Sequence, residues 1–219
     1  MLIDDDRRYR TTVLSTTRLM AAPLIPEIPL HLAMHSHDIW QIVEEQVAET
    51  QAKRPYWAFA WPGGQAMARY LVDNPHWVAG KRILDLGCGS GIGAIAAMEA
   101  GARSALANDI DPLALVATRL NAAANGVEVA TTVDDILADV PSDIDVILLA
   151  DIVYEPDLHA RVSAFIQTAA SRKIPILFAD RGTTRLPLSP LQKLAEYKAD
   201  VCPTMADMQF ERGIVWRLA

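Results

Sequence analysis

Short apolar runs alternate with segments of helical periodicity through most of this chain. The apolar runs cover residues 81–87, 104–107, 127–131, 144–150 and 174–179. The helical segments between them cover residues 92–100, 111–125 and 158–170. Strands that alternate with helices predict a parallel sheet covered by helices on both faces. The run 144–150 is nearly all apolar, as expected of a strand buried on both sides.

The first fifty residues do not follow this alternation. We expect residues 1–35 to be irregular, because Pro23, Pro26 and Pro29 would interrupt a regular helix. A helical pattern then covers residues 36–51, where apolar and polar positions separate onto two faces.

The C-terminal end changes character as well. Residues 197–202 and 214–218 predict two strands without a good helix between them, and we expect an antiparallel pair at one edge of the sheet. A chain of 219 residues is long enough for one substantial core. We therefore predict an N-terminal extension over residues 1–53 and one α/β domain over residues 54–219.

Composition and charge narrow the classes of partner. The net charge is −7 and there is no basic run, which argues against a nucleic-acid partner. Asp145 and Asp151 interrupt the longest apolar stretch, which is too short to span a bilayer. The N-terminus is acidic and lacks the apolar segment of a signal peptide. With two cysteines, Cys88 and Cys202, no disulfide framework is implied. We expect a cytoplasmic monomer that does not bind membranes.

The densest motif links an apolar run to a helical segment. It reads Ile83-Leu-Asp-Leu-Gly-Cys-Gly-Ser-Gly-Ile-Gly93, and its candidate cofactor-binding glycines are Gly87, Gly89 and Gly91. Glycines let a ligand lie against bare backbone, and the following helix N-terminus can hold an anion. The same residues fit the dinucleotide pattern G-x-G-x-x-A, so glycines alone leave a nicotinamide-dependent oxidoreductase open.

Asp85 favours a different cofactor. It precedes Gly87 by two residues, at the carboxyl end of the strand where a ligand would lie. A carboxylate there repels a pyrophosphate but suits the ammonium or sulfonium group of S-adenosylmethionine. The loop also lacks the lysine or arginine that would hold a phosphate. The motif therefore predicts S-adenosylmethionine as the cofactor.

Further carboxylates follow the next two predicted strands. Asp109 ends the second strand, where it can accept from both hydroxyls of an adenosine ribose. Asp111 precedes Pro112 and is the expected N-cap of the next helix. After the third strand, we choose Asp135 over Asp134 as the acceptor for an adenine amino group, with a solvated turn as the alternative.

Candidate acceptor-binding residues follow the fourth strand. Asp151 and Tyr154 can point the same way if the chain turns helically after that strand. A carboxylate and a phenol on one wall of a methyl-transfer site suit an amine acceptor. We name these two residues as catalytic.

An aromatic segment lies upstream at residues 54–64. Four of its residues are aromatic, and it ends in Pro62-Gly-Gly. One interpretation is core packing. The other is a flap over the cofactor, with Trp61 next to the ligand.

Histidines and a cysteine raise the possibilities of a metal site and of a nucleophile, but their surroundings favour neither. His31, His35 and His37 have a spacing that resembles a metal site, but no nearby cysteine or carboxylate completes one, so we expect packing or surface residues. Cys88 has no obvious histidine base, so we expect a small buried residue rather than a nucleophile. No metal is predicted.

The glycine loop, Asn108-Asp109-Ile-Asp-Pro and Asp151-x-x-Tyr154 resemble motifs of the seven-β-strand class I methyltransferases. The last motif is similar to that of a subgroup of protein-lysine methyltransferases. The segment Pro55-Tyr-Trp-Ala-Phe-Ala-Trp-Pro-Gly-Gly-Gln-Ala is more specific, and resembles the lysine methyltransferases of the electron transfer flavoprotein β-subunit.

This resemblance covers residues 54–219 and implies a Rossmann-like doubly wound sheet of seven strands. Their order would be 3-2-1-4-5-7-6, with strand 7 antiparallel. The resemblance implies a cofactor site lined by Trp61, Gly87, Gly89, Gly91, Asp109 and Asp135. It also implies a lysine channel lined by Asp151 and Tyr154, and the β-subunit as protein substrate. A small-molecule N- or O-methyltransferase is the alternative, and a non-catalytic cofactor-binding protein would not need the Asp151–Tyr154 pair.

Overall fold

The computed structural model describes residues 2–34, 39, 54–152, 156–182, 191–198 and 212–218. The helices are α1 (Leu2–Thr16), α3 (Pro62–Asp73), α4 (Ile92–Glu99), α5 (Pro112–Ala124) and α6 (Pro156–Ser171), with 3-10 turns η1 (Tyr56–Ala58), η2 (Pro75–Trp77) and η3 (Ile136–Ala138). The strands are β1 (Thr17–Ala22), β2 (Ile25–Ala33), β3 (Arg82–Leu86), β4 (Ser104–Asn108), β5 (Ala130–Thr132), β6 (Val146–Ala150), β7 (Ile176–Asp180), β8 (Leu191–Lys198) and β9 (Arg212–Leu218). None of these described helices is long and apolar enough to cross a membrane.

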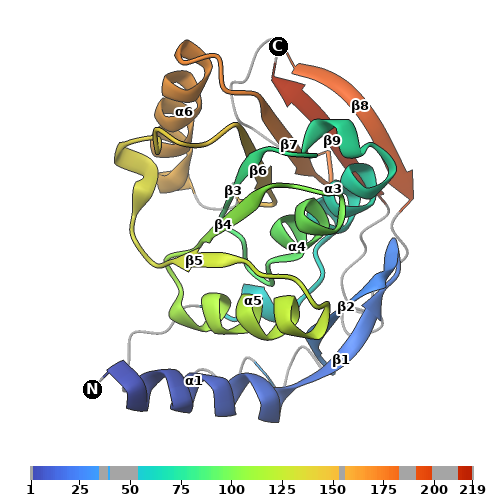
Figure 1. Ribbon diagram of the computed structural model, residues 1–219, viewed down its shortest axis with the longest axis vertical. Coiled ribbons are helices and arrows are strands. Elements are labelled where there is room, and N and C mark those ends of the chain that lie inside the picture. The colour runs from blue at the N-terminus through green and yellow to red at the C-terminus, as the bar shows by residue number, and fades with distance from the viewer. Residues whose placement is uncertain are drawn as a thin grey trace.

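Seven of these strands form one twisted sheet (Figure 1). Its order is β5-β4-β3-β6-β7-β9-β8, which reads 3-2-1-4-5-7-6 when the strands are counted from β3. The strands from β5 to β7 are parallel, whereas β9 runs antiparallel to both β7 and β8. The α/β fold class is confirmed.

Each face of this sheet has its own apolar core. Alternate strand residues such as Ile83 and Leu148 join a buried cluster with α3, α4 and α5. Their neighbours Leu84 and Leu149 join a second cluster with α6. Period-2 alternation explains this separation, because successive strand residues point to opposite faces. It also explains why these strands read as continuous apolar runs in the sequence.

The predicted bounds of the strands and helices agree closely with the structure at the centre of the sheet and less well near its edges. Asp111 caps α5, since its Oδ1 accepts from Leu113 N at 2.9 Å, and Pro112 is the first helical residue. The expected third strand at 127–131 is shorter and later, at Ala130–Thr132. The expected strand at 197–202 begins earlier, at Leu191, and residues 199–211 lie outside the described part.

The expectation of irregular structure over residues 1–35 was wrong. Helix α1 is followed by an antiparallel hairpin of β1 and β2, and α1 lies along α5 (Figure 1). Pro23 stands in the turn, while Pro26 and Pro29 lie in β2, which pairs with β1 alone among the described strands and so tolerates a missing N–H. The helix expected at 36–51 lies outside the described residues except for Ile39.

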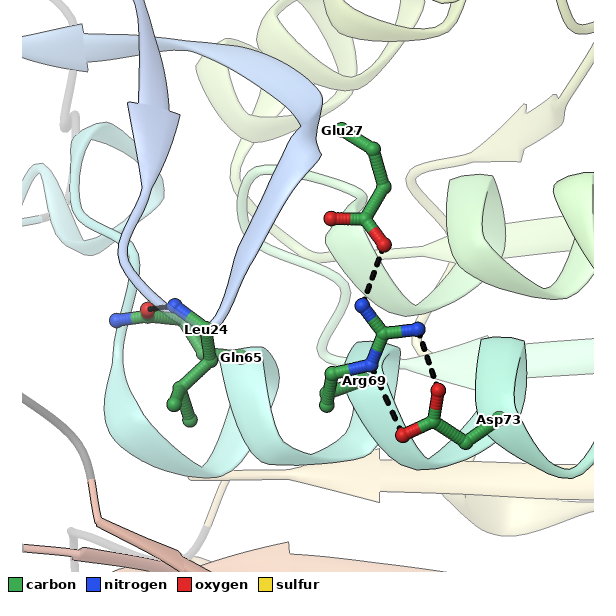
Figure 2. A network of polar contacts seen from close by, with 5 residues as sticks. All are labelled: Leu24, Glu27, Gln65, Arg69 and Asp73. Atoms are coloured by element: carbon green, nitrogen blue, oxygen red, sulfur yellow. Dashed lines mark hydrogen bonds and ion pairs between the residues drawn. The ribbon is translucent and has the colours of Figure 1, made fainter.

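The hairpin is also fastened to α3 (Figure 2). Leu24 N donates to Gln65 Oε1 at 3.1 Å, and Arg69 pairs with both Glu27 and Asp73. Hairpin residues such as Ile28 and Leu30 are buried in the same cluster as α3 and α5. The N-terminal extension is therefore packed onto the core of the domain, although the proposed division at residue 53 remains a prediction.

Candidate active site

The glycine loop joins β3 to α4 in a left-handed conformation. Gly87, Gly89 and Gly91 have φ values of 69°, 53° and 78°, which favour glycine. A Cβ at Gly87 would lie 2.7 Å from Ile152 Cδ1, and one at Gly91 would lie 2.6 Å from Thr118 Cγ2. At Gly89 the nearest atom would be Trp57 Cα, at 3.8 Å. The protein therefore crowds the loop at both ends and leaves space at Gly89.

Asp85 stabilises the helix that follows this loop. The carboxylate is 3% exposed and accepts from Ala94 N, in the first turn of α4, at 2.8 Å. A Cβ at Gly93 would lie 2.9 Å from Asp85 Oδ2, so this glycine makes room for the carboxylate. Burial raises the pKa of Asp85 to about 7, and the nearby charge of Asp109 adds to this rise.

Asp151 does the same for α3. Its Oδ2 accepts from Gly64 N at 3.0 Å, in the first turn of that helix. A Cβ at Gly63 would lie 2.6 Å from the same oxygen. Burial raises the pKa of Asp151 to about 7, although the N–H groups of Gly64 and Gly63 oppose this rise. Asp151 has a φ of 50°, a left-handed conformation that aspartate tolerates better than most residues.

The two carboxylates therefore have matching positions at the centre of the sheet. Strands β3 and β6 are neighbours, and Asp85 and Asp151 stand at or just beyond their carboxyl ends. In each case the helix has a glycine where the carboxylate approaches. Parallel sheets of this kind bind ligands where the strand order reverses, which here is between β3 and β6.

Asp109 and its neighbour Asn108 hold the other side of the loop. Asp109 accepts from Gly89 N and from Asp111 N, both at 3.0 Å. Asn108 is 3% exposed and donates to the backbone oxygens of Thr132 and Asp134. Asp109 is therefore placed against the open glycine of the loop, and its contact with a ribose stays a prediction.

The carboxylate of Asp135 already has hydrogen-bond partners within the protein. It caps η3 through Leu137 N, and both of its carboxylate oxygens accept from the Arg161 guanidinium, at 2.6 and 2.7 Å. An adenine amino group would have to share this carboxylate with Arg161. The assignment of Asp135 to adenine remains a prediction.

The aromatic segment lies against the glycine loop. Trp61 packs edge-on against Tyr56 and Phe59, and its Nε1 donates to Tyr56 O at 2.9 Å. Trp57, which the sequence did not single out, is 1% exposed and lies beside Gly89. Its Nε1 has no hydrogen-bond partner within the described ranges. The segment is a packing element placed beside the loop, and a contact between Trp61 and the cofactor stays a prediction.

Other candidates have simpler explanations or lie outside the described part. Cys88 is buried, which raises the pKa of its thiol well above the usual range, as expected for a packing residue rather than a nucleophile. His31 lies in β2, with Nδ1 3.3 Å from Thr17 Oγ1, and burial with the charge of Arg10 lowers its pKa. Tyr154, His35 and His37 lie outside the described residues.

The chain is similar to methyltransferases of known name. A model of the ribosomal protein L11 methyltransferase family (PrmA) matches residues 71–170. The electron transfer flavoprotein beta subunit lysine methyltransferase of Xenopus laevis is 37% identical over 194 residues, which are 86% of this chain and 78% of that protein. This chain belongs to that lysine methyltransferase family.

A second relative and one solved structure are also similar to this chain. The Homo sapiens protein of the same name is 43% identical over 180 residues, or 80% of this chain and 68% of that protein. The solved structure of Thermoplasma acidophilum 1320 matches with a TM-score of 0.51 at 21% identity, over 70% of this chain and 88% of that chain. The latter shows the fold alone. The chain is an S-adenosylmethionine-dependent protein-lysine methyltransferase.

The loop fits S-adenosylmethionine. Space at Gly89 lies beside Asp109, and the buried carboxylate of Asp85 lies behind the same loop. Carboxylates suit a cofactor that carries an ammonium and a sulfonium group, while no cationic side chain in residues 83–93 would hold a pyrophosphate. When bound, this cofactor supplies an electrophilic methyl group.

We expect replacement of Asp109 by alanine to weaken S-adenosylhomocysteine binding by about 1.5–3 kcal/mol, as for a lost charged hydrogen bond. The free energy of unfolding should also fall by about 1 kcal/mol, because Gly89 N loses its acceptor. Calorimetry and chemical denaturation measure the two effects. Asp111→Ala is the control, since loss of this helix cap should lower the free energy of unfolding and leave cofactor affinity unchanged. Equal affinity in both variants would place the ribose contact elsewhere.

A second expectation concerns pH. Because the pKa of Asp85 is about 7 in the fold and 3.8 in its ordinary state, the folded protein holds a proton that the unfolded chain releases between these values. The contribution of Asp85 to stability therefore falls as pH rises towards 7 and is constant above it. Chemical denaturation at pH values from 5 to 8 measures this effect. As pH rises towards 7, the free energy of unfolding of the wild type should fall relative to that of Asp85→Asn. If the stability of both proteins changed equally with pH, the raised pKa of Asp85 would be contradicted.

Proposed function

We propose that this enzyme methylates a lysine ε-amine of the electron transfer flavoprotein beta subunit. The observation that carries the proposal is the identity of 37–43% to relatives of that name over most of their length. Its action in the cytoplasm as a monomer is part of the same proposal and follows from the sequence analysis alone.

In this proposal, the acceptor lysine approaches beside Asp151 and Tyr154. Asp151 is fixed at the end of β6, and the next residue, Ile152, lies against Gly87 of the cofactor loop. An acceptor beside Asp151 would therefore be next to the cofactor. The carboxylate attracts the lysine ammonium, whose ordinary pKa is about 10.4.

Methyl transfer needs the amine in its neutral form. The ammonium would first release a proton to solvent. With the cofactor bound, the neutral amine would then accept its methyl group and become a methylated ammonium, and the sulfonium would leave as a neutral thioether. The residues of this chain contribute orientation and charge, because reacting atoms must be held in line at about 3 Å. No covalent enzyme intermediate is required.

The proposal is tested with purified enzyme, methyl-labelled S-adenosylmethionine and purified beta subunit. We expect label on the beta subunit, at a lysine identified by mass spectrometry, and none when excess S-adenosylhomocysteine is added. The same reaction with a filtered extract of metabolites tests the alternative acceptor. Label in small molecules and none in the beta subunit would support a small-molecule methyltransferase instead.

A further inference from the structure

Helix α5 has a buried polar face that the catalytic assignment does not use. Thr118 and Asn121 are each 0% exposed, and they lie three residues apart on one side of the helix. Buried polar side chains are costly unless they are hydrogen-bonded, so their partners indicate why they are there.

Asn121 connects two segments that are far apart in the sequence. Its Oδ1 accepts from His31 N in β2 at 2.7 Å, and its Nδ2 donates to Ser90 O in the glycine loop at 2.8 Å. One donor and one acceptor are required, and the amide satisfies both in a single orientation. The N-terminal hairpin and the cofactor loop are therefore joined by one side chain.

Thr118 holds the adjoining peptide of the loop. Its Oγ1 donates to Gly89 O at 3.2 Å, and its methyl group occupies the space that a Cβ at Gly91 would need. Across a trans peptide, the C=O of one residue and the N–H of the next point in opposite directions. Fixing the carbonyl of Gly89 on the α5 side therefore turns Ser90 N–H away from α5.

The hairpin end of this connection is itself fixed. Asn125, the C-cap of α5 and one helical turn after Asn121, donates to Pro29 O in β2 at 2.8 Å, so the end of α5 is bonded to β2. Near its turn, the hairpin is also bonded to α3 through Gln65 and Arg69 (Figure 2). The position of His31 N is thus determined by two helices that flank the cofactor loop.

We infer that the N-terminal hairpin is part of the cofactor-binding machinery, and that Asn121 is the positioning residue through which it sets the conformation of the glycine loop. The inference rests on the binding of S-adenosylmethionine by this loop and is independent of which lysine is methylated. Its test therefore uses cofactor binding, so failure of the substrate proposal would leave it unaffected.

The test measures the Kd of S-adenosylhomocysteine by calorimetry, the KM for S-adenosylmethionine, kcat, and the unfolding midpoint. Asn121→Ala should raise Kd and KM about tenfold, the scale of one lost hydrogen bond, with kcat at saturating cofactor changed less than about threefold. Asn74→Ala is the matched control, since its amide donates to Tyr70 O at the far end of α3 and should leave Kd unchanged. A lower unfolding midpoint with unchanged Kd in Asn121→Ala would show a purely structural role and overturn the inference.

Three variants separate the two ends of the connection. Thr118→Val keeps the side-chain shape but removes the hydrogen bond to Gly89 O, and Asn121→Asp can still accept from His31 N but, when ionised, cannot donate to Ser90 O. Both variants should raise Kd, as Asn121→Ala should. They also test the inference if Asn121→Ala fails to fold. Asn125→Ala removes the hydrogen bonds to Pro29 O in the hairpin and to the backbone oxygen of Asn121, and it should raise Kd about threefold. Wild-type affinity in Thr118→Val and Asn121→Asp, or in Asn125→Ala, would overturn the inference.

Discussion

Replacement of Asp151 by asparagine is expected to reduce lysine methylation by at least ~10²-fold, the usual scale for a positioned catalytic group. The change keeps the shape of the side chain and removes the charge that, in our proposal, attracts the lysine ammonium. It also weakens the cap on α3, where Asp151 Oδ2 accepts from Gly64 N. Initial rates with the beta subunit and labelled cofactor measure the effect.

Cofactor affinity distinguishes this assignment from its alternative. It should remain within a few-fold in Asp151→Asn, because Asp85 and Asp109 hold the other side of the loop. Asp145→Asn is the matched control, since Asp145 pairs with Arg82 at the opposite end of the same strands and should leave the rate unchanged. Full methylation with lost cofactor binding in Asp151→Asn would show that this carboxylate serves the cofactor.

Replacement of Gly63 by alanine is expected to lower methylation by at least ~10²-fold and the free energy of unfolding by about 1–3 kcal/mol. The new Cβ would lie 2.6 Å from Asp151 Oδ2 and 2.7 Å from Ala179 O. The second contact is with the backbone of β7, which cannot rotate away, so either α3 or the end of β7 must shift. Initial rates and chemical denaturation report the two effects.

The adjacent glycine provides the control. A Cβ at Gly64 would meet only Ile92 Cγ2, at 3.1 Å, and this side chain can move by a few tenths of an ångström. Gly64→Ala keeps the N–H that Asp151 accepts from, and alanine favours helix more than glycine does. We expect a stability change below about 1 kcal/mol and activity close to wild type. Equal losses in both variants would contradict the specific clash at Gly63.

The sequence predicted what depends on neighbouring residues. The alternation of apolar runs and helical segments predicted the α/β sheet, and the spacing of the glycines predicted a loop between a strand and a helix. Asp111 and Pro112 marked the start of α5 correctly, because an N-cap bonds within its own helix turn. These features are local, so a short window of sequence contains all the groups involved.

The prolines of residues 23–29 show where the local argument fails. A regular helix would not tolerate them, but a hairpin strand with one partner does, and sequence alone did not distinguish a strand from irregular chain. What decided the outcome was the surface of α3 and α5, which supplies Gln65, Asn121 and Asn125 as partners for the backbone of the hairpin.

The same reason applies to the candidate site. The sequence predicted a set of carboxylates at the candidate site, since each lies near the carboxyl end of a strand. They are Asp85, Asp109, Asp135 and Asp151, and their contacts with ligands stay predictions. The sequence did not predict that Asp151 caps a helix 87 residues earlier, or that Asn121 bonds a loop and a hairpin on either side of it. Hydrogen-bond partners at that separation are set by the packing of layers, which only the tertiary structure determines.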